Sequence, residues 1–132
     1  SINAYKLFMM DVGLLGALSE LPAETILEGN DIFVEFKGAL TEQYVLQQMI
    51  SDTPYTPYYY GTDKGTFEQD FLIQKERNIV PIEVKAEGNL RSQSLKAYCE
   101  KFHPNMAVRL SALKYKEQDW MINLPLYAVC NL

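Results

Sequence analysis

Residues 70–85 read DFLIQKERNIVPIEVK, two apolar runs on either side of the polar segment Lys75–Asn78. Short runs rich in β-branched and aromatic residues around such a segment predict an antiparallel hairpin. With the turn centred between positions 76 and 77, flush pairing places Asp70 opposite Glu83, with Cβ atoms about 4.5–5.5 Å apart. Because side chains alternate along a strand, Lys85 then shares a face with Glu83.

Two carboxylates that face each other in this way repel, unless one is protonated or a cation lies between them. A solvated face with a Glu83–Lys85 ion pair explains the same pattern. A slip of one residue would also separate the acids, because it moves every side chain of a strand to the other face.

The segments around the hairpin predict an α/β fold, a mixed sheet flanked by helices. Its core order is helix, three strands, helix, strand. Asp11 and Ser92 are suited to cap the helices that they precede. The predicted helices cover 11–18, 23–28, 31–50 and 92–102, and the predicted strands cover 58–60, 67–74, 79–85, 106–110, 120–122 and 126–129.

The 132 residues suit one domain over 1–132, and 48% hydrophobic with 22% charged residues excludes a disordered chain. The net charge of −5 argues against a non-specific nucleic-acid coat. However, residues 85–116 hold 7 basic and 2 acidic side chains, against 5 and 13 in residues 1–84.

No apolar run of about 18 residues exists, so no membrane partner is expected. Cys99 and Cys130 lack the spacing of metal ligands, and two reduced thiols are typical of a cytoplasmic protein.

Glu42 is a further acidic residue in an unusual place. On the long predicted helix it lies among Ala39, Val45, Leu46 and Met49, inside the apolar stripe. A carboxylate there is costly unless it is paired, although a Glu at the edge of the stripe can also reach water. If this helix packs on the hairpin, Glu42 approaches Asp70 and Glu83.

Three carboxylates and one lysine form a set of hard oxygen ligands suited to Mg²⁺ or Mn²⁺, with Glu42, Asp70 and Glu83 as the metal ligands. Such an ion polarises a phosphoryl oxygen and lowers the pKa of a bound water, which suits phosphodiester hydrolysis. Lys85 would position that water, help to deprotonate it, or stabilise the developing charge. We therefore predict Glu42, Asp70, Glu83 and Lys85 as catalytic residues.

Asp70 followed by Ile82-Glu83-Val84-Lys85 resembles the PD-(D/E)xK signature of restriction-endonuclease-like nucleases. The leading Pro of that signature is replaced by Gln69. The resemblance implies a nuclease-like fold and metal-dependent cleavage of DNA.

A longer set of motifs covers most of the chain: KLFMMDVGLL (6–15), KGALTE (37–42), YY (59–60), EQDF (68–71), PIEVK (81–85) and LPLY (124–127). In that order these motifs resemble the C-terminal domain of unknown function of bacterial and archaeal AAA-type ATPases, which is itself similar to those nucleases. The resemblance implies an upstream ATPase domain in the same protein. No GxxxxGK[ST] motif is present, so we expect no ATP site in these residues.

The basic segment supplies the predicted DNA contacts Arg91, Gln93, Lys96 and Lys101, on or beside the second long helix. Contacts of this kind bind phosphates without reading sequence. A solvated helix face accounts for the same residues equally well.

Three functions remain open on the sequence alone. The first is a Mg²⁺-dependent deoxyribonuclease attached to an ATPase, and the alternative is a domain that docks DNA or protein, or regulates the ATPase, without cleaving. The third is a structural role in forming a homo-oligomer. Fold similarity alone does not decide among them.

Overall fold

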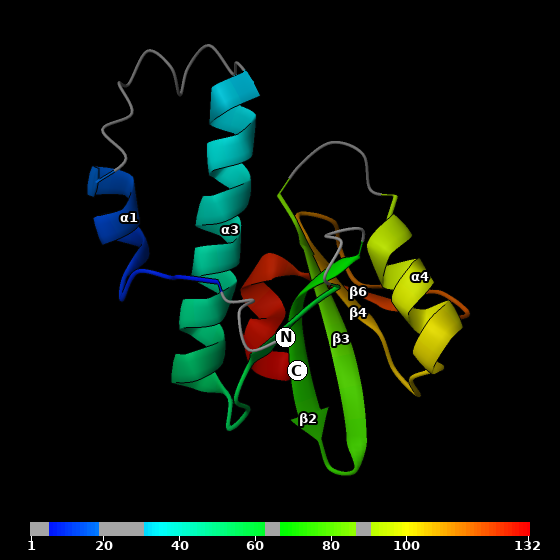
Figure 1. Cartoon of the computed structure of the whole chain (residues 1–132). Helices are drawn as coiled ribbons and strands as arrows, with labels where there is room; N and C mark the ends of the chain where they lie inside the picture. Colours follow the sequence, from blue (N-terminus) through cyan, green and yellow to red (C-terminus); the bar gives the residue numbers. More distant parts are fainter. Residues whose placement is uncertain (1–5, 19–30, 63–66, 87–90) are drawn as a thin grey trace.

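The computed structural model describes residues 6–18, 31–62, 67–86 and 91–132. Within them, six strands form one sheet in the order β1-β2-β3-β4-β6-β5, flanked by helices (Figure 1). The helices are α1 (Val12–Leu18), α3 (Asp31–Asp52), α4 (Gln93–Phe102) and the 3₁₀ helix η1 (Leu126–Asn131), and the strands are β1 (Tyr58–Gly61), β2 (Glu68–Lys75), β3 (Asn78–Lys85), β4 (Val108–Ser111), β5 (Lys116–Glu117) and β6 (Ile122–Pro125).

The predicted hairpin is formed by β2 and β3. The two strands pair from Phe71 opposite Ile82 to Lys75 opposite Asn78, which is the register expected from the sequence. Glu76 begins the turn with a φ of 57°, a left-handed conformation that non-glycine residues seldom adopt outside turns. The chain therefore reverses where the polar segment predicts.

A bulge in β2 changes the outcome at Asp70. Tyr58 of β1 pairs with Leu72, but Tyr60 pairs with Gln69, so β2 holds one more residue than β1 between these pairs. A bulge of this kind redirects a side chain and disrupts the ladder locally. Gln69 lines a cavity beside α4, whereas the Asp70 side chain contacts Lys6 near α3.

The other half of the sheet is mixed. β3 runs parallel to β4, β4 runs parallel to β6, and β5 pairs antiparallel with β6. The predicted α/β class and its mixed sheet flanked by helices are thus confirmed, and so is the core order of α3, three strands, α4 and β4.

The last predicted strand is wrong, because residues 126–129 belong to the 3₁₀ helix η1. Its buried side chain Val129, like the buried Leu132, packs into the core on the α3 side. Residues three apart lie on one side of a 3₁₀ helix, and the apolar run was mistaken for a buried strand. The strand predicted at 120–122 begins instead at Ile122.

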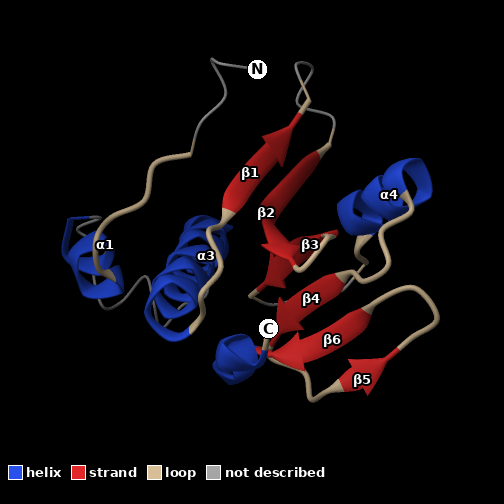
Figure 2. Cartoon of the chain, turned by 90° about the horizontal axis from the view of Figure 1, so that it is seen from below, coloured by secondary structure: helices blue, strands red, loops and turns tan. Residues whose placement is uncertain are grey.

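The helices cover the two sides of the sheet unequally. Figure 2 shows α1, α3 and η1 on one side of the sheet and α4 on the other. The larger core joins Val45 and Met49 of α3 to Phe71, Ile82 and other strand residues. A smaller core joins Leu95 of α4 to Ala107 and Met121.

Both predicted N-caps occupy the positions expected, but only one of them caps. Asp11 Oδ1 accepts hydrogen bonds from the backbone N–H groups of Gly13 (2.8 Å) and Leu14 (3.2 Å). Ser92 precedes α4 without a side-chain capping bond, and its hydroxyl instead accepts from Arg109 Nη1 at 3.3 Å. The predicted helix at 23–28 lies outside the described residues.

None of the helices in the described ranges combines the length and the apolar character that crossing a bilayer requires.

Neighbouring residues on α3 provide a test of this packing. Met49 is fully buried, whereas 64% of Ile50 is exposed. We expect Met49→Ala to lower the free energy of unfolding by about 2–5 kcal/mol, because it leaves a cavity in the larger core. Ile50→Ala should change it by less than about 0.5 kcal/mol. Urea denaturation of both variants measures the difference, and equal losses would contradict the position of α3.

Candidate functional site

Glu42 lies on the side of α3 that faces the bulge. Its Oε2 accepts a hydrogen bond of 3.1 Å from Lys6 Nζ, and the same ammonium lies 3.5 Å from Asp70 Oδ1. A cavity of about 270 Å³ adjoins this group and is lined by Lys6, Phe8, Glu42 and Gln43, among others. The predicted carboxylates Glu42 and Asp70 are therefore brought together, with a lysine from the N-terminal segment between them.

The backbone of β3 fixes the orientation of Asp70. Pairing between β2 and β3 reaches Phe71 and Ile82, and beyond it the Val84 N–H donates to Asp70 Oδ2 at 2.7 Å. Beside the bulge, the Asp70 carboxylate therefore accepts a hydrogen bond from a backbone N–H of β3. The other oxygen, Oδ1, is left to face Lys6.

The charges of this group act on one another. Burial and the Asp70 carboxylate raise the pKa of Glu42, while the Lys6 ammonium opposes both effects. Burial acts to lower the pKa of Lys6, but the carboxylates of Glu42 and Asp70 outweigh it and the pKa is raised. Lys6 is therefore a full positive charge at neutral pH, and it lies beside Glu42, whose ionisation the Asp70 charge disfavours.

Glu83 lies on the α4 side of the sheet with a different set of partners. It is 6% exposed, and its neighbour across the parallel pair of β3 and β4 is Arg109. Glu83 Oε1 is 3.7 Å from Lys85 Nζ, so the predicted pair Glu83–Lys85 does form. Glu83 Oε2 is buried and has no hydrogen-bond partner within the described part of the chain.

Burial is the main cause of a raised pKa at Glu83. A hydrogen bond with Ser92 and the charges of Lys85 and Arg109 lower it, whereas the charge of Asp70 raises it further. The net shift is upward because desolvation penalises the charged form. An ionised Glu83 with an unpartnered oxygen is thus a costly arrangement.

The three predicted metal ligands are not grouped around one point. Across residues 6–18, 31–62, 67–86 and 91–132, no three His, Cys, Asp or Glu side chains lie close enough to hold one ion. Lys6 lies between Glu42 and Asp70, and strand alternation directs Glu83 toward α4. The chemistry of Glu42 and Asp70 nevertheless fits a hard cation, since these two carboxylates already share one positive charge.

Sequence reasoning missed two residues of the site. Lys6 is separated from Glu42 by 36 positions. The only sequence signal for Lys6 was its place in the motif KLFMMDVGLL (6–15). Arg109 interrupts the apolar run of β4, and a buried guanidinium of this kind requires acceptors. It is 5% exposed, and its Nε donates to Asn123 Oδ1 at 2.9 Å. Its charge also lowers the pKa of Glu83 on the neighbouring strand. A basic residue inside the apolar run was therefore the sequence signal for a buried charged partner.

All four predicted DNA contacts have exposed side chains at the N-terminal end or along α4. Gln93 lies on the side of α4 opposite Leu95, the residue that packs into the smaller core, and Lys96 lies about 100° around the helix from Leu95. Lys101 Nζ lies 5.2 Å from the centre of the Phe102 ring. The four residues are Arg91, Gln93, Lys96 and Lys101.

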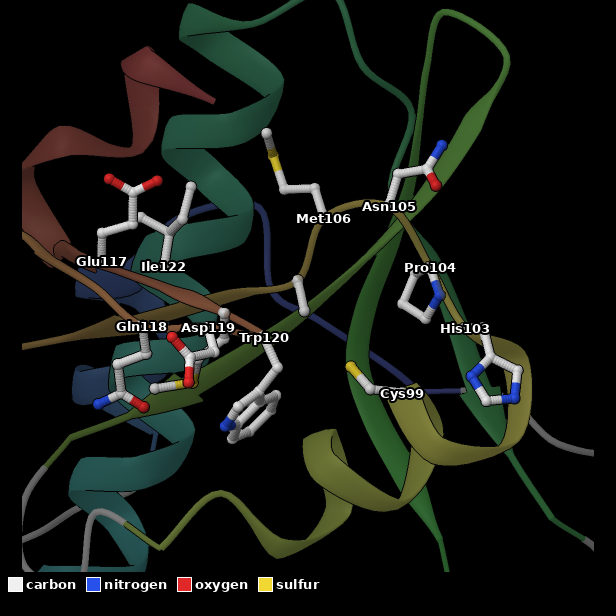
Figure 3. Close-up of a pocket in the computed structure, with 12 residues that line it drawn as sticks. Cys99, His103, Pro104, Asn105, Met106, Glu117, Gln118, Asp119, Trp120 and Ile122 are labelled. Atoms are coloured by element: carbon white, nitrogen blue, oxygen red, sulfur yellow. The ribbon is translucent and has the colours of Figure 1, made fainter.

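A larger cavity, of about 480 Å³, lies beyond the C-terminal end of α4 (Figure 3). Cys99, His103, Asp119 and Trp120 are among its lining residues, and none of the predicted catalytic residues is. Burial raises the pKa of the Cys99 thiol, which is therefore protonated at neutral pH. This cavity does not provide an activated thiolate.

The fold and these contacts define an α/β domain with a lysine-bridged acidic pair beside a buried Glu-x-Lys strand. Residues 37–128 match the family described as Domain of unknown function (DUF4143), and the chain belongs to that family. The match includes Glu42, Asp70, Glu83 and Lys85, while Lys6 lies before it. No curated protein is similar enough to match the chain.

The raised pKa of Glu83 makes a prediction about stability and pH. The folded state favours protonated Glu83. The resulting stability is fully present below pH 4.5, the ordinary pKa of Glu83 in the unfolded chain, and it is lost as the pH rises through the raised pKa of the folded state. Because Gln cannot ionise, Glu83→Gln should gain stability relative to the wild type as the pH rises above 4.5.

Urea unfolding at several pH values measures this difference. Glu117→Gln, which changes an exposed carboxylate of β5, serves as the control and should leave the difference flat. A difference for Glu83→Gln that does not change with pH would show that Glu83 is not held in a desolvated environment.

Proposed function

We propose that this domain hydrolyses DNA phosphodiester bonds with Mg²⁺ or Mn²⁺, as a restriction-endonuclease-like domain of the PD-(D/E)xK type. One observation carries the proposal. The Lys6 ammonium lies 3.1 Å from Glu42 Oε2 and 3.5 Å from Asp70 Oδ1, so both carboxylates share one positive charge. This pair lies next to the strand that carries Glu83 and Lys85. A position that attracts an ammonium between two carboxylates also attracts a divalent cation.

Asp70 and Glu42 would hold the ion, whereas the Glu83 carboxylate lies on the α4 side of the sheet and would not reach it in this arrangement. When bound, the ion would lower the pKa of a water and polarise the scissile phosphate. The chain's own contribution is positional. The Val84 N–H fixes the Asp70 carboxylate, and burial between α3 and the sheet limits its motion.

Lys85 is the residue proposed to act on the water and on the phosphate. Its ammonium is 3.7 Å from Glu83 Oε1, a distance that keeps it near the carboxylate without a hydrogen bond, and its side chain is 30% exposed. It can therefore turn toward a bound phosphate, where a positive charge stabilises the charge that develops during hydrolysis.

The exposed face of α4 supports binding to the DNA backbone. Gln93, Lys96 and Lys101 are available to phosphates, since their side chains are exposed. The resemblance to the C-terminal domains of AAA-type ATPases supports an upstream ATPase in the same protein as the partner, in the cytoplasm. A domain that binds DNA through few charges has a low affinity by itself, and a linked ATPase domain that also binds DNA would raise the combined affinity.

A second function is favoured by the same lysine. Lys6 already supplies one positive charge to Glu42 and Asp70, which reduces the repulsion between the two carboxylates without a metal ion. A domain in this state would dock DNA or a protein, or regulate the ATPase, without cleaving. Metal-dependent cleavage distinguishes the two functions.

We expect the intact protein to nick or cut DNA in Mg²⁺ or Mn²⁺, and Asp70→Asn to slow cleavage roughly 10²-fold or more. The Asn oxygen can still accept from the Val84 N–H, so the fold should persist. Lys85→Met should cause a similar loss. Gel assays on supercoiled, linear, single-stranded and branched DNA measure the rates.

Asp52→Asn is the matched control for these variants, because Asp52 is an exposed carboxylate at the end of α3. It should cleave at the wild-type rate. Equal cleavage by the wild type, Asp70→Asn and Lys85→Met would assign any activity to a contaminant and contradict the proposal.

Binding to DNA in EDTA tests α4 separately from cleavage. Lys96→Ala and Lys101→Ala should each reduce the slope of log K against log salt by about 0.9, the loss of one phosphate contact. Lys116→Ala, in the edge strand β5, should leave the slope unchanged. Identical slopes for all three variants would place the DNA contacts elsewhere.

A further inference from the structure

The segment 6–12, called the strap below, is held along α3 by glutamine side chains. Gln43 Oε1 accepts from the Met9 N–H at 2.8 Å, and Gln43 Nε2 donates to the Met9 carbonyl at 2.7 Å. The Val12 N–H donates to Gln47 Oε1 at 3.0 Å. Because Gln43 is 2% exposed, this backbone contact is buried and fixes the strap in register with the helix.

The strap presents alternate side chains to the protein. Phe8 packs against the core, with its ring 5.8 Å from that of Phe71, whereas 87% of Leu7 is exposed. An extended chain alternates in this way, so Lys6 is directed inward on the same side as Phe8. The position of Lys6 therefore follows from the hydrogen bonds at Met9.

Lys6 Nζ meets three groups at the end of the strap. It contacts Glu42 at 3.1 Å and Asp70 at 3.5 Å, and it lies 5.1 Å from the centre of the Tyr59 ring. The two acids provide the charge, and the ring provides a cation–π contact. This is a specific site for one positive charge, and the occupant is supplied by the chain itself.

We infer that Lys6 is a tethered cation that competes with a divalent metal ion for the Glu42–Asp70 pair, so that the ion binds only as Lys6 leaves and the strap loosens. Two positive charges cannot share the pair without strong repulsion. Metal affinity and strap position are therefore coupled, and the coupling is reciprocal. The inference rests on the proposed metal site, but it can be tested without DNA.

Removal of the lysine charge should strengthen metal binding. We expect Lys6→Met to bind Mn²⁺ on the order of tenfold more tightly than the wild type, within the usual range of couplings between sites. Lys116→Met, which removes an exposed lysine in β5, should bind as the wild type does. Isothermal titration with MnCl₂ measures the affinities. Equal or weaker binding by Lys6→Met, or no binding by either protein, would overturn the inference.

A measurement on the wild type guards against misfolding of the variant. The Met9 and Val12 amides are hydrogen-bonded to α3 in the strap, so displacement of Lys6 should expose them. Saturating Mn²⁺ should therefore speed their hydrogen exchange several-fold, although bound ligands ordinarily slow exchange. Unchanged or slower exchange at both amides under saturation would also overturn the inference.

The outcomes separate this inference from the proposed nuclease activity. Tighter Mn²⁺ binding by Lys6→Met without DNA cleavage leaves the competition intact and removes the nuclease function. Cleavage by the wild type together with unaltered Mn²⁺ binding by Lys6→Met removes the competition and leaves the nuclease function intact.

Discussion

The hydrogen bond from the Val84 N–H to Asp70 Oδ2 is the contact on which the acidic site depends. It lies where the β2–β3 ladder gives way to the bulge, and it turns a carboxylate that would face α4 toward α3. Without it, Val84 would have a backbone donor to satisfy next to the core. The same contact leaves Asp70 Oδ1 as the oxygen that meets Lys6.

The sheet consequently separates two charged networks that the sequence brings together. Glu42, Lys6 and Asp70 form one network on the α3 side, while Glu83, Arg109 and their hydrogen-bonding partners form the other on the α4 side. The charge of Asp70 still raises the pKa of Glu83, so the two networks interact across the strands. Protonation in one network is thereby coupled to charge in the other.

Local patterns were sufficient to predict the hairpin register, the long helix with Glu42 on its buried side, and the Asp11 cap. Each depends on residues that are close in sequence. The bulge depends on how β1 pairs with β2, and nothing in residues 68–72 indicates an extra residue there. Lys6 reaches the site through backbone contacts with Gln43, a long-range arrangement that no periodicity records. The 3₁₀ helix η1 was missed because a short apolar run suits either structure.

The shortness of β5 bears on how the protein behaves at high concentration. Edge strands with unpaired backbone groups are templates for pairing with another molecule, and a long apolar edge promotes aggregation. Here the edge strand has two residues, Lys116 and Glu117, and both are exposed and charged. It covers part of β6, whose buried Asn123 and Pro125 would otherwise form that edge. A short, charged edge strand offers another molecule few backbone groups with which to pair, so this side of the sheet is protected against self-association.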